Sequence, residues 1–178
     1  MICLKIDALD DIKMTVKSIV ILQSRFNSTR LPGKALYPIN GFPLVVLSAL
    51  RAANTGKNVL VATSTEVSDD ELCRVLDKHS IKFFRGSLNN VLDRFKEALK
   101  NFEDDDIVFR LTADNVLPDG LFLDEIEKQF FGNKLDIMTC SPEGSGLPYG
   151  LCAEIMRVKS IRLAHQNACS SGDLEHVT

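Results

Sequence analysis

The sequence lacks any apolar run that is long enough to cross a membrane. A membrane-spanning helix needs roughly 18–20 consecutive apolar residues, and the apolar stretches of this chain are much shorter. The first 17 residues contain three aspartates and no long apolar block, so they do not resemble a secretory signal. We therefore expect a protein that makes no membrane contact and is located in the cytoplasm.

The five cysteines of the chain form no CxxC pair, and none has a histidine nearby at metal-ligand spacing. This distribution argues against a disulfide framework and against a structural zinc site. The remaining interpretation is a set of reduced thiols that are mostly buried.

Acidic residues are absent between Ile12 and Thr65, although the whole chain has a formal net charge of -3. The same segment carries seven lysines and arginines. An N-terminal third with this charge pattern is suited to bind an anion. A nucleic acid is excluded as the partner, because the rest of the chain is acidic and three of the cations fall in one short loop.

The composition is that of one globular domain, with 178 residues of which 45% are hydrophobic and 25% are charged. Short apolar runs alternate with segments of helical periodicity. The expected strands are residues 18–22, 58–63, 82–85, 107–111, 136–139 and 152–158. The expected helices are residues 43–54, 68–79, 91–102 and 122–132, with a last helix beginning near Ser160. A capping box of Ser68 and Glu71 is expected to open the second helix. The alternation predicts a three-layer α/β sandwich around a mostly parallel sheet.

Ligands of parallel α/β sheets bind outside the carboxyl ends of the strands. Four loops are therefore expected to face one cleft, those after Leu22, Thr63, Arg85 and Leu111. The strongest signal is the first of these loops, residues 23–34 (QSRFNSTRLPGK). Two arginine forks, a lysine, hydroxyl side chains and a Pro-Gly turn can wrap a polyphosphate. The loop is neither a Walker A sequence nor a GxGxxG dinucleotide turn.

This loop resembles the QARxxSTRLPGK signature of the nucleotide-diphospho-sugar transferase superfamily, most closely in its branch of spore-coat polysaccharide biosynthesis protein F-like cytidylyltransferases. The similarity continues in order along the chain, through residues 61–64 (VATS), 84–87 (FRGS), 91–94 (VLDR), 110–114 (RLTAD) and 148–151 (PYGL) to Glu154. The resemblance implies a Rossmann-like, GT-A-like fold. It also implies an N-terminal extension over residues 1–17 and a nucleotidyltransferase domain over residues 18–178.

The activity that the resemblance implies is transfer of a nucleotide from a nucleoside triphosphate, expected to be CTP, to a sugar or sugar acid. Pyrophosphate leaves, and the product serves polysaccharide or surface-glycan biosynthesis. Such a transfer depends on neutralising charge more than on covalent help. Two alternatives stay open: a sugar-1-phosphate nucleotidyltransferase, and a nucleotide-binding module without turnover. A homodimer also stays open.

The resemblance assigns roles to individual residues. The catalytic cations that hold the triphosphate are Arg25, Arg30 and Lys34. The residues assigned to nucleotide binding are Gln23, Ser24, Ser28, Gly33, Ala62, Thr63 and Ser64. The residues assigned to the acceptor side of the cleft are Arg85, Gly86, Asp93, Arg94 and Glu154. Asp114, at the end of a strand, is assigned to the cofactor Mg²⁺, a hard cation suited to a carboxylate and several waters.

Some of these residues also have ordinary structural interpretations. Asp93 and Arg94 would begin an exposed helix, where an aspartate is favourable in any case. Glu154 is equally suited to pair with Arg157 on the same strand. His165 has no carboxylate partner at a telling spacing and is expected at a helix surface, which leaves no acyl-transfer triad.

The chain departs from the family pattern in three places. Asn115 and Val116 replace the usual Cys-Pro, and Cys152 stands where a GLDVE-like motif has its aspartate. The chain also ends at Thr178, inside what resembles the family's REHVT segment. We therefore expect it to lack a C-terminal part of the domain, in which sugar-acid cytidylyltransferases carry a second metal-binding aspartate. Whether these residues alone are active stays open.

Overall fold

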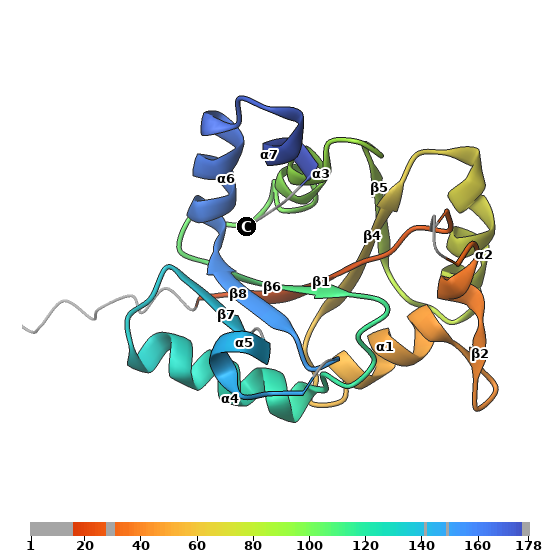
Figure 1. Ribbon diagram of the computed structural model, residues 1–178, viewed down its shortest axis with the longest axis horizontal. Coiled ribbons are helices and arrows are strands. Elements are labelled where there is room, and N and C mark those ends of the chain that lie inside the picture. Colours follow the sequence, from red (N-terminus) through yellow and green to blue (C-terminus); the bar gives the residue numbers. More distant parts are fainter. Residues whose placement is uncertain (1–15, 28–30, 141, 149, 176–178) are drawn as a thin grey trace, which may run out of the picture.

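A six-stranded sheet forms the centre of the molecule, with the strand order β5-β4-β1-β6-β8-β7 (Figure 1). The computed structural model describes residues 16–27, 31–140, 142–148 and 150–175. The strands are β1 (Ser18–Gln23), β4 (Val59–Ser64), β5 (Phe83–Gly86), β6 (Ile107–Thr112), β7 (Ile137–Cys140) and β8 (Ala153–Arg157). Strands β5, β4, β1 and β6 are parallel, and β8 is antiparallel to both of its neighbours. The expected α/β fold with a mostly parallel sheet is confirmed.

Helices cover both faces of the sheet and make three layers (Figure 1). Buried side chains of α1 (Leu44–Ala52), α2 (Asp70–Lys78) and α4 (Gly120–Gly132) join one core cluster. Those of α3 (Val91–Ala98) and α6 (Val158–Asn167) join the other, and α7 (Ser171–Glu175) contacts α3. The longest described helix has 13 residues, and no helix in the described ranges combines the length and apolarity that a membrane span requires.

Strand β1 shows why the sheet has a core on each side. Val20 and Leu22 belong to one cluster, and Ile19 and Ile21 belong to the other. A strand whose consecutive residues are all apolar can bury alternate side chains on opposite faces, as buried parallel sheets require. The continuous apolar run therefore places β1 at the centre, with its carboxyl end opening toward the candidate site.

Several short elements were not expected from the sequence. Strands β2 (Pro38–Ile39) and β3 (Phe42–Pro43) form a hairpin, whose turn residues Asn40 and Gly41 have φ angles of 50° and 85°. Asn-Gly suits a tight hairpin turn because both residues tolerate positive φ. The pair therefore predicts the hairpin, although the hairpin was not among the expected elements. The other additions are the 3-10 helices η1 (Lys34–Leu36) and η2 (Val67–Asp69), and the helices α5 (Pro142–Ser145) and α7.

The expected capping box of Ser68 and Glu71 is wrong. Helix η2 occupies this position, and α2 begins after it, at Asp70. The N-cap residue Asp69 makes no side-chain hydrogen bond to the first turn of α2. Its carboxylate instead accepts hydrogen bonds from the N–H of Phe26, in the loop after β1, and from the hydroxyl of Thr63, near the end of β4.

Each cysteine in the described ranges is a free thiol, as expected. Cys73 is buried, whereas Cys140 and Cys152 are partly exposed and Cys169 is exposed. The expectation that most thiols are buried is therefore wrong for these positions. Cys3 lies outside the described residues.

Candidate functional site

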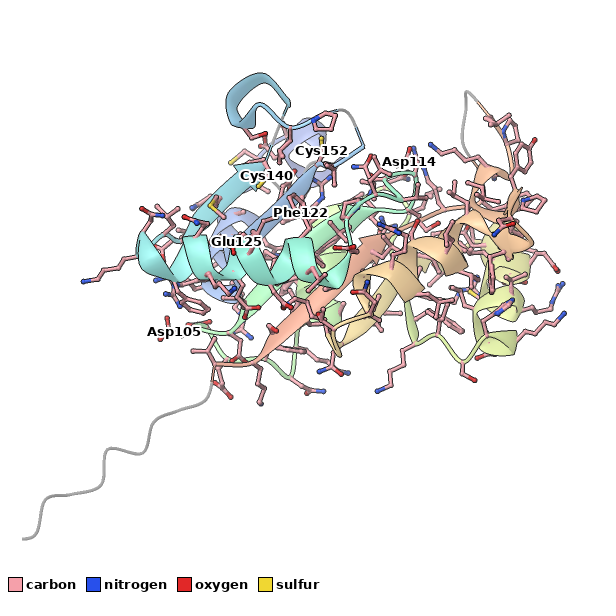
Figure 2. The ribbon with its side chains drawn as sticks, turned by 90° about the horizontal axis from the view of Figure 1, so that it is seen from below. Asp105, Asp114, Phe122, Glu125, Cys140 and Cys152 are labelled. Carbon is pink, nitrogen blue, oxygen red and sulfur yellow. The ribbon has the colours of Figure 1, made fainter. Side chains whose placement is uncertain are left out.

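Two loops at the carboxyl edge of the sheet line one cavity of about 180 Å³. The register of β1 and β6, with Gln23 opposite Thr112, sets these two loops side by side. The polar lining residues are Gln23, Ser24, Arg25, Lys34, Arg94, Thr112 and Asp114. Figure 2 shows Asp114 at this edge, with Asp105 at the opposite end of β6. Two further expected members of the loop, Ser28 and Arg30, lie outside the described residues.

Lys34 and Asp114 form an ion pair at this cavity. Lys34 follows Gly33, whose φ of 73° lies in the left-handed region that glycine tolerates best. Burial acts to raise the pKa of Asp114, but hydrogen bonds from Lys34 and Thr112 outweigh it and hold the pKa below its ordinary value. The side chain of Asp114 is still 43% exposed. An ionised carboxylate beside a cation therefore faces the cavity.

Asp114 is the one carboxylate among the described residues that line this cavity. In the described ranges, no group of three or more His, Cys, Asp or Glu side chains could hold a metal ion by itself. Mg²⁺, however, is commonly bound by one or two carboxylates together with substrate phosphates and waters. Asp114 fits Mg²⁺ in that manner, as a single protein ligand beside a bound phosphate.

Arg94 reaches the same cavity from α3, on the other side of the sheet. Its side chain is 1% exposed, and its Nη1 donates a hydrogen bond of 3.0 Å to the carbonyl of Ser87. A Cβ at Gly86 would lie 2.8 Å from Cγ of Arg94, so the glycine allows the close approach. The burial of Arg94 corrects the expectation that it lies on an exposed helix. Gly86 packs against Arg94, and its expected acceptor role stays a prediction.

Ala62, Thr63 and Ser64 are fully buried, and their expected contact with the nucleotide stays a prediction. The hydroxyls of Thr63 and Ser64 both donate to the carboxylate of Asp69, with 2.9 Å from Thr63 Oγ1 to Asp69 Oδ2. Their role is to support the end of β4.

Asp69 is the important residue that sequence reasoning missed. It is 1% exposed and also accepts hydrogen bonds from the backbone N–H groups of Ser64, at 2.9 Å, and Phe26, at 2.7 Å. The carboxylate thus ties the loop that carries Arg25 to the end of β4. Its position just after a strand that ends in two hydroxyl residues was the available signal. Burial acts to raise the pKa of Asp69, but these hydrogen bonds hold it below the ordinary value.

We expect acid to weaken the protein partly through Asp69. Because its folded pKa lies below the ordinary 3.8, the unfolded chain takes up this proton first as the pH falls. The stabilisation is therefore present above pH 3.8 and is lost as the pH falls through the folded pKa. Urea unfolding at pH 7 and at successively lower pH values measures it. Asp69→Asn should show a flatter decline than the unchanged chain, and equal declines would contradict the assignment.

Arg85 and Asp93 are engaged in internal contacts. Arg85 donates to the carbonyls of Ser64 and Glu66, at 2.9 and 2.8 Å, and pairs with Asp70 at 2.8 Å. These bonds fix the loop after β4, and the expected acceptor role of Arg85 stays a prediction. Asp93 Oδ1 lies 3.1 Å from Nε2 of His165. This contact between α3 and α6 corrects the expectation that His165 lacks a carboxylate partner, whereas the acceptor-side role of Asp93 stays a prediction.

Glu154 pairs with Arg110 rather than with Arg157. Both carboxylate oxygens lie 2.8 Å from Nη1 of Arg110, since the antiparallel register sets these two residues opposite each other. Arg157 instead contacts Asp136 and Asp105.

The Arg110–Glu154 pair lines a second cavity of about 190 Å³, which shares the lining residue Thr112 with the first. The lining of this second cavity also includes Asn115, Thr139, Cys140 and Cys152.

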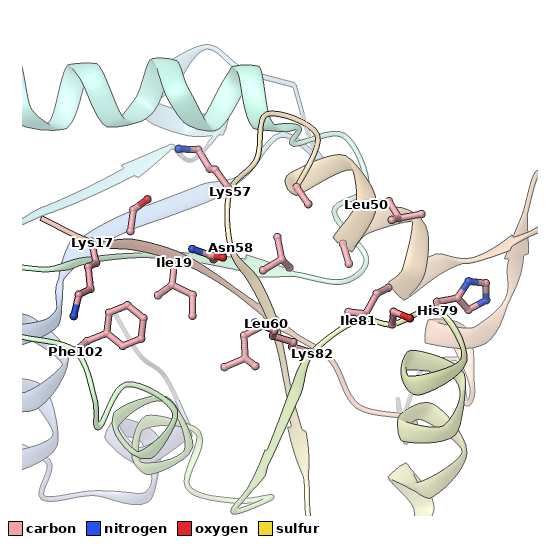
Figure 3. Close-up of a pocket in the computed structure, with 15 residues that line it drawn as sticks. Lys17, Ile19, Leu50, Lys57, Asn58, Leu60, His79, Ile81, Lys82 and Phe102 are labelled. Atoms are coloured by element: carbon pink, nitrogen blue, oxygen red, sulfur yellow. The ribbon is translucent and has the colours of Figure 1, made fainter. Parts of the chain in front are cut away.

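A further cavity, of about 630 Å³, lies elsewhere, where β1 and β4 begin (Figure 3). Its labelled apolar residues include Ile19, Leu60 and Phe102. Lys57 also lines it but is held by Asp124 and Glu127, at 2.8 and 2.6 Å. Of the assigned residues that the structure describes, none lines this cavity, so the candidate chemistry belongs to the carboxyl edge.

Comparison with known proteins gives matches over most of the chain. A family model described as cytidylyltransferase matches residues 19–171. The spore coat polysaccharide biosynthesis protein SpsF of Bacillus subtilis is 31% identical over 165 residues, which cover 89% of this chain and 67% of that protein. A solved structure of a cytidylyltransferase from Leptospira borgpetersenii has a TM-score of 0.82 at 27% identity, covering 91% of this chain and 69% of that one.

A further relative is the 3-deoxy-manno-octulosonate cytidylyltransferase of Pectobacterium carotovorum. It is 32% identical over 123 residues, which cover 67% of this chain and 48% of that protein. The chain is shorter than its relatives, since it spans 67% of the Bacillus protein and 66% of an uncharacterized protein of Methanocaldococcus jannaschii.

Proposed function

This chain belongs to the cytidylyltransferase family, and on that premise we propose that it transfers a cytidylyl group from CTP to a sugar or sugar acid. The observation that carries the proposal is the convergence of Arg25, Lys34 and Asp114 on one cavity at the carboxyl edge of the sheet. The name of the Pectobacterium relative supports a sugar acid as the acceptor. The name of the Bacillus relative supports a product used in polysaccharide biosynthesis.

In the proposed reaction, the oxygen of an acceptor hydroxyl attacks the α-phosphorus of CTP in line, and the hydroxyl proton is released to solvent. The bond from that phosphorus to the oxygen bridging it to the β-phosphate breaks, and pyrophosphate leaves with the bonding electrons. Negative charge grows on the leaving group, so fixed positive groups are the main requirement. Arg25 can hold two phosphate oxygens as a planar fork, whereas Lys34 acts as a compact charge. Arg30 and Ser28 are proposed to bind the same triphosphate, with Gln23, Ser24 and Gly33 contacting the nucleotide.

Asp114 is the residue that we assign to Mg²⁺. When bound, Mg²⁺ neutralises charge on phosphate oxygens and helps to fix their orientation. The depressed pKa of Asp114 keeps this side chain ionised near neutral pH. Lys34 beside it compensates the carboxylate charge in the free protein and lies at the cavity that we assign to the phosphates.

We assign the acceptor to the second cavity, where Glu154 and Arg110 lie. This cavity borders the first at Thr112, so an acceptor held there would face the α-phosphate. Its polar lining, including the side chains of Asn115 and Thr139, suits the hydroxyls of a sugar. Glu154 remains the acceptor-side residue in this proposal.

The test is pyrophosphate release from CTP and Mg²⁺ in the presence of a panel of sugars, sugar acids and sugar 1-phosphates. We expect saturable release with CTP and an unphosphorylated sugar or sugar acid. Release that requires a sugar 1-phosphate would favour the alternative nucleotidyltransferase. Nucleotide binding with no release for any acceptor would contradict the proposal and favour a binding module.

A further inference from the structure

Arg94 carries a charge that the described part of the protein does not neutralise. The side chain is 1% exposed, and the structure gives it one hydrogen bond, to the carbonyl of Ser87. Its Nε is buried and has no hydrogen-bond partner among the described residues. Buried guanidinium groups ordinarily pair with a carboxylate, because an unpaired buried charge is costly.

The charges around Arg94 act on it in opposite directions. Burial lowers the pKa of Arg94, and the neighbouring charge of Arg25 lowers it further, while Asp69 opposes both effects. The carboxylate of Asp69 already accepts hydrogen bonds from Phe26, Thr63 and Ser64. Arg25 and Arg94 therefore line one cavity, and neither forms an ion pair with a carboxylate in the described ranges.

Ser24 supplies a second unsatisfied polar atom at the same cavity. Its Oγ is buried and has no partner in the part of the chain that the structure describes, and the residue is 6% exposed. Ser24, Arg25 and Arg94 all line the cavity. Unsatisfied buried polar atoms are uncommon in native proteins, and each calls for an explanation. An anion with several oxygens would accept from both guanidinium groups and from the hydroxyl.

We propose that Arg94 binds the phosphates of the nucleotide directly, together with Arg25 and Ser24. The residue is thereby moved from the acceptor side of the site to the donor side. This inference rests on the proposed function for the identity of the anion, but the anion site itself needs no turnover. An oligophosphate without a nucleoside should therefore occupy it and stabilise the folded chain.

Inorganic pyrophosphate is the probe for this site, and calorimetric titration with thermal melting gives the readout. We compare the unchanged chain with Arg94→Met and with the control Arg74→Met, which removes the same charge from an exposed position on α2. Arg94→Met should weaken pyrophosphate binding by at least about tenfold, because a charge-assisted hydrogen bond is lost. It should also abolish most of the pyrophosphate-induced rise in melting temperature. Arg74→Met should behave like the unchanged chain in both measurements.

A measurement on the unchanged chain avoids any doubt about folding of the variant. The Nε–H signal of Arg94, assigned by triple-resonance NMR, should shift when pyrophosphate is added. Gly86→Ala supplies a variant that keeps the charge but crowds Cγ of Arg94 at 2.8 Å, and it should weaken binding as well. Unchanged affinity in Arg94→Met, or an Nε–H signal that does not move at saturating pyrophosphate, would overturn the inference.

The two proposals fail in distinguishable ways. Pyrophosphate binding that depends on Arg94, in a chain that never releases pyrophosphate from CTP, would contradict the proposed transfer and leave the anion site standing. Turnover of CTP by a chain whose Arg94→Met variant binds pyrophosphate normally would support the transfer and remove Arg94 from the site.

Discussion

Replacing Asp114 with asparagine is expected to lower pyrophosphate release from CTP by about 100-fold or more, while the chain stays folded. The substitution removes the carboxylate that we assign to Mg²⁺ and the ionic partner of Lys34. The side chain is 43% exposed, so it contributes little to the core. Steady-state release at saturating Mg²⁺ measures the rate, and thermal melting reports whether the variant is folded.

Asp105→Asn is the matched control for this substitution. Asp105 lies at the opposite end of β6 from Asp114 (Figure 2), and its side chain is 69% exposed. Its loss removes the same charge without touching the cavity, so its rate should equal that of the unchanged chain. If Asp114→Asn also turns over at the normal rate, the metal is held by other residues and the assignment of Asp114 is wrong.

Replacing Asp69 with alanine is expected to lower the free energy of unfolding by about 3–5 kcal/mol, the range for removing one partner from a buried charged network. The substitution leaves the N–H groups of Phe26 and Ser64 and the hydroxyl of Thr63 without their acceptor. Buried donors without an acceptor are destabilising, because they lose their hydrogen bonds to water and gain none in the protein. Urea unfolding at pH 7 gives the difference.

Asp77→Ala is the control, because Asp77 is an exposed residue of the neighbouring helix α2. We expect a change within about 0.5 kcal/mol, as at ordinary surface positions. A loss of less than about 1 kcal/mol for Asp69→Ala would contradict the view that this carboxylate holds the loop to β4. The loop carrying Arg25 would then have to be positioned by other contacts.

The sheet could be predicted from the sequence because its strands are encoded locally. Residues 19–22 are an uninterrupted apolar run, residues 107–111 are apolar except for Arg110, and both segments form central strands as expected. The cations of the first loop were also visible, since residues 24–34 follow β1 directly in the sequence. A position at the carboxyl end of a parallel strand then implies a position in the cleft.

The contacts between distant segments could not be predicted in this way. Asp69 accepts from the N–H of Phe26, and Asp93 meets His165 from another helix. Neither pair has a spacing that a sequence pattern reveals. For Arg94 the alternative to an acceptor-side role was the start of an exposed helix, and nothing in the adjacent sequence indicates that this side chain is buried. Its burial depends on Gly86, which has no side chain and lets Arg94 approach closely. It also depends on the helix layer formed by α3 and α6.

Thermal melting with CTP, UTP, GTP and ATP, each with and without Mg²⁺, tests most directly the claim that the carboxyl-edge cavity binds a cytidine nucleotide. A ligand that binds only the folded chain raises its melting temperature by mass action. We predict a rise with CTP that increases with Mg²⁺ and exceeds the rise with each of the other three nucleotides, whose triphosphates can occupy only the anion site. No rise with any nucleotide, at concentrations up to several millimolar, would contradict the account.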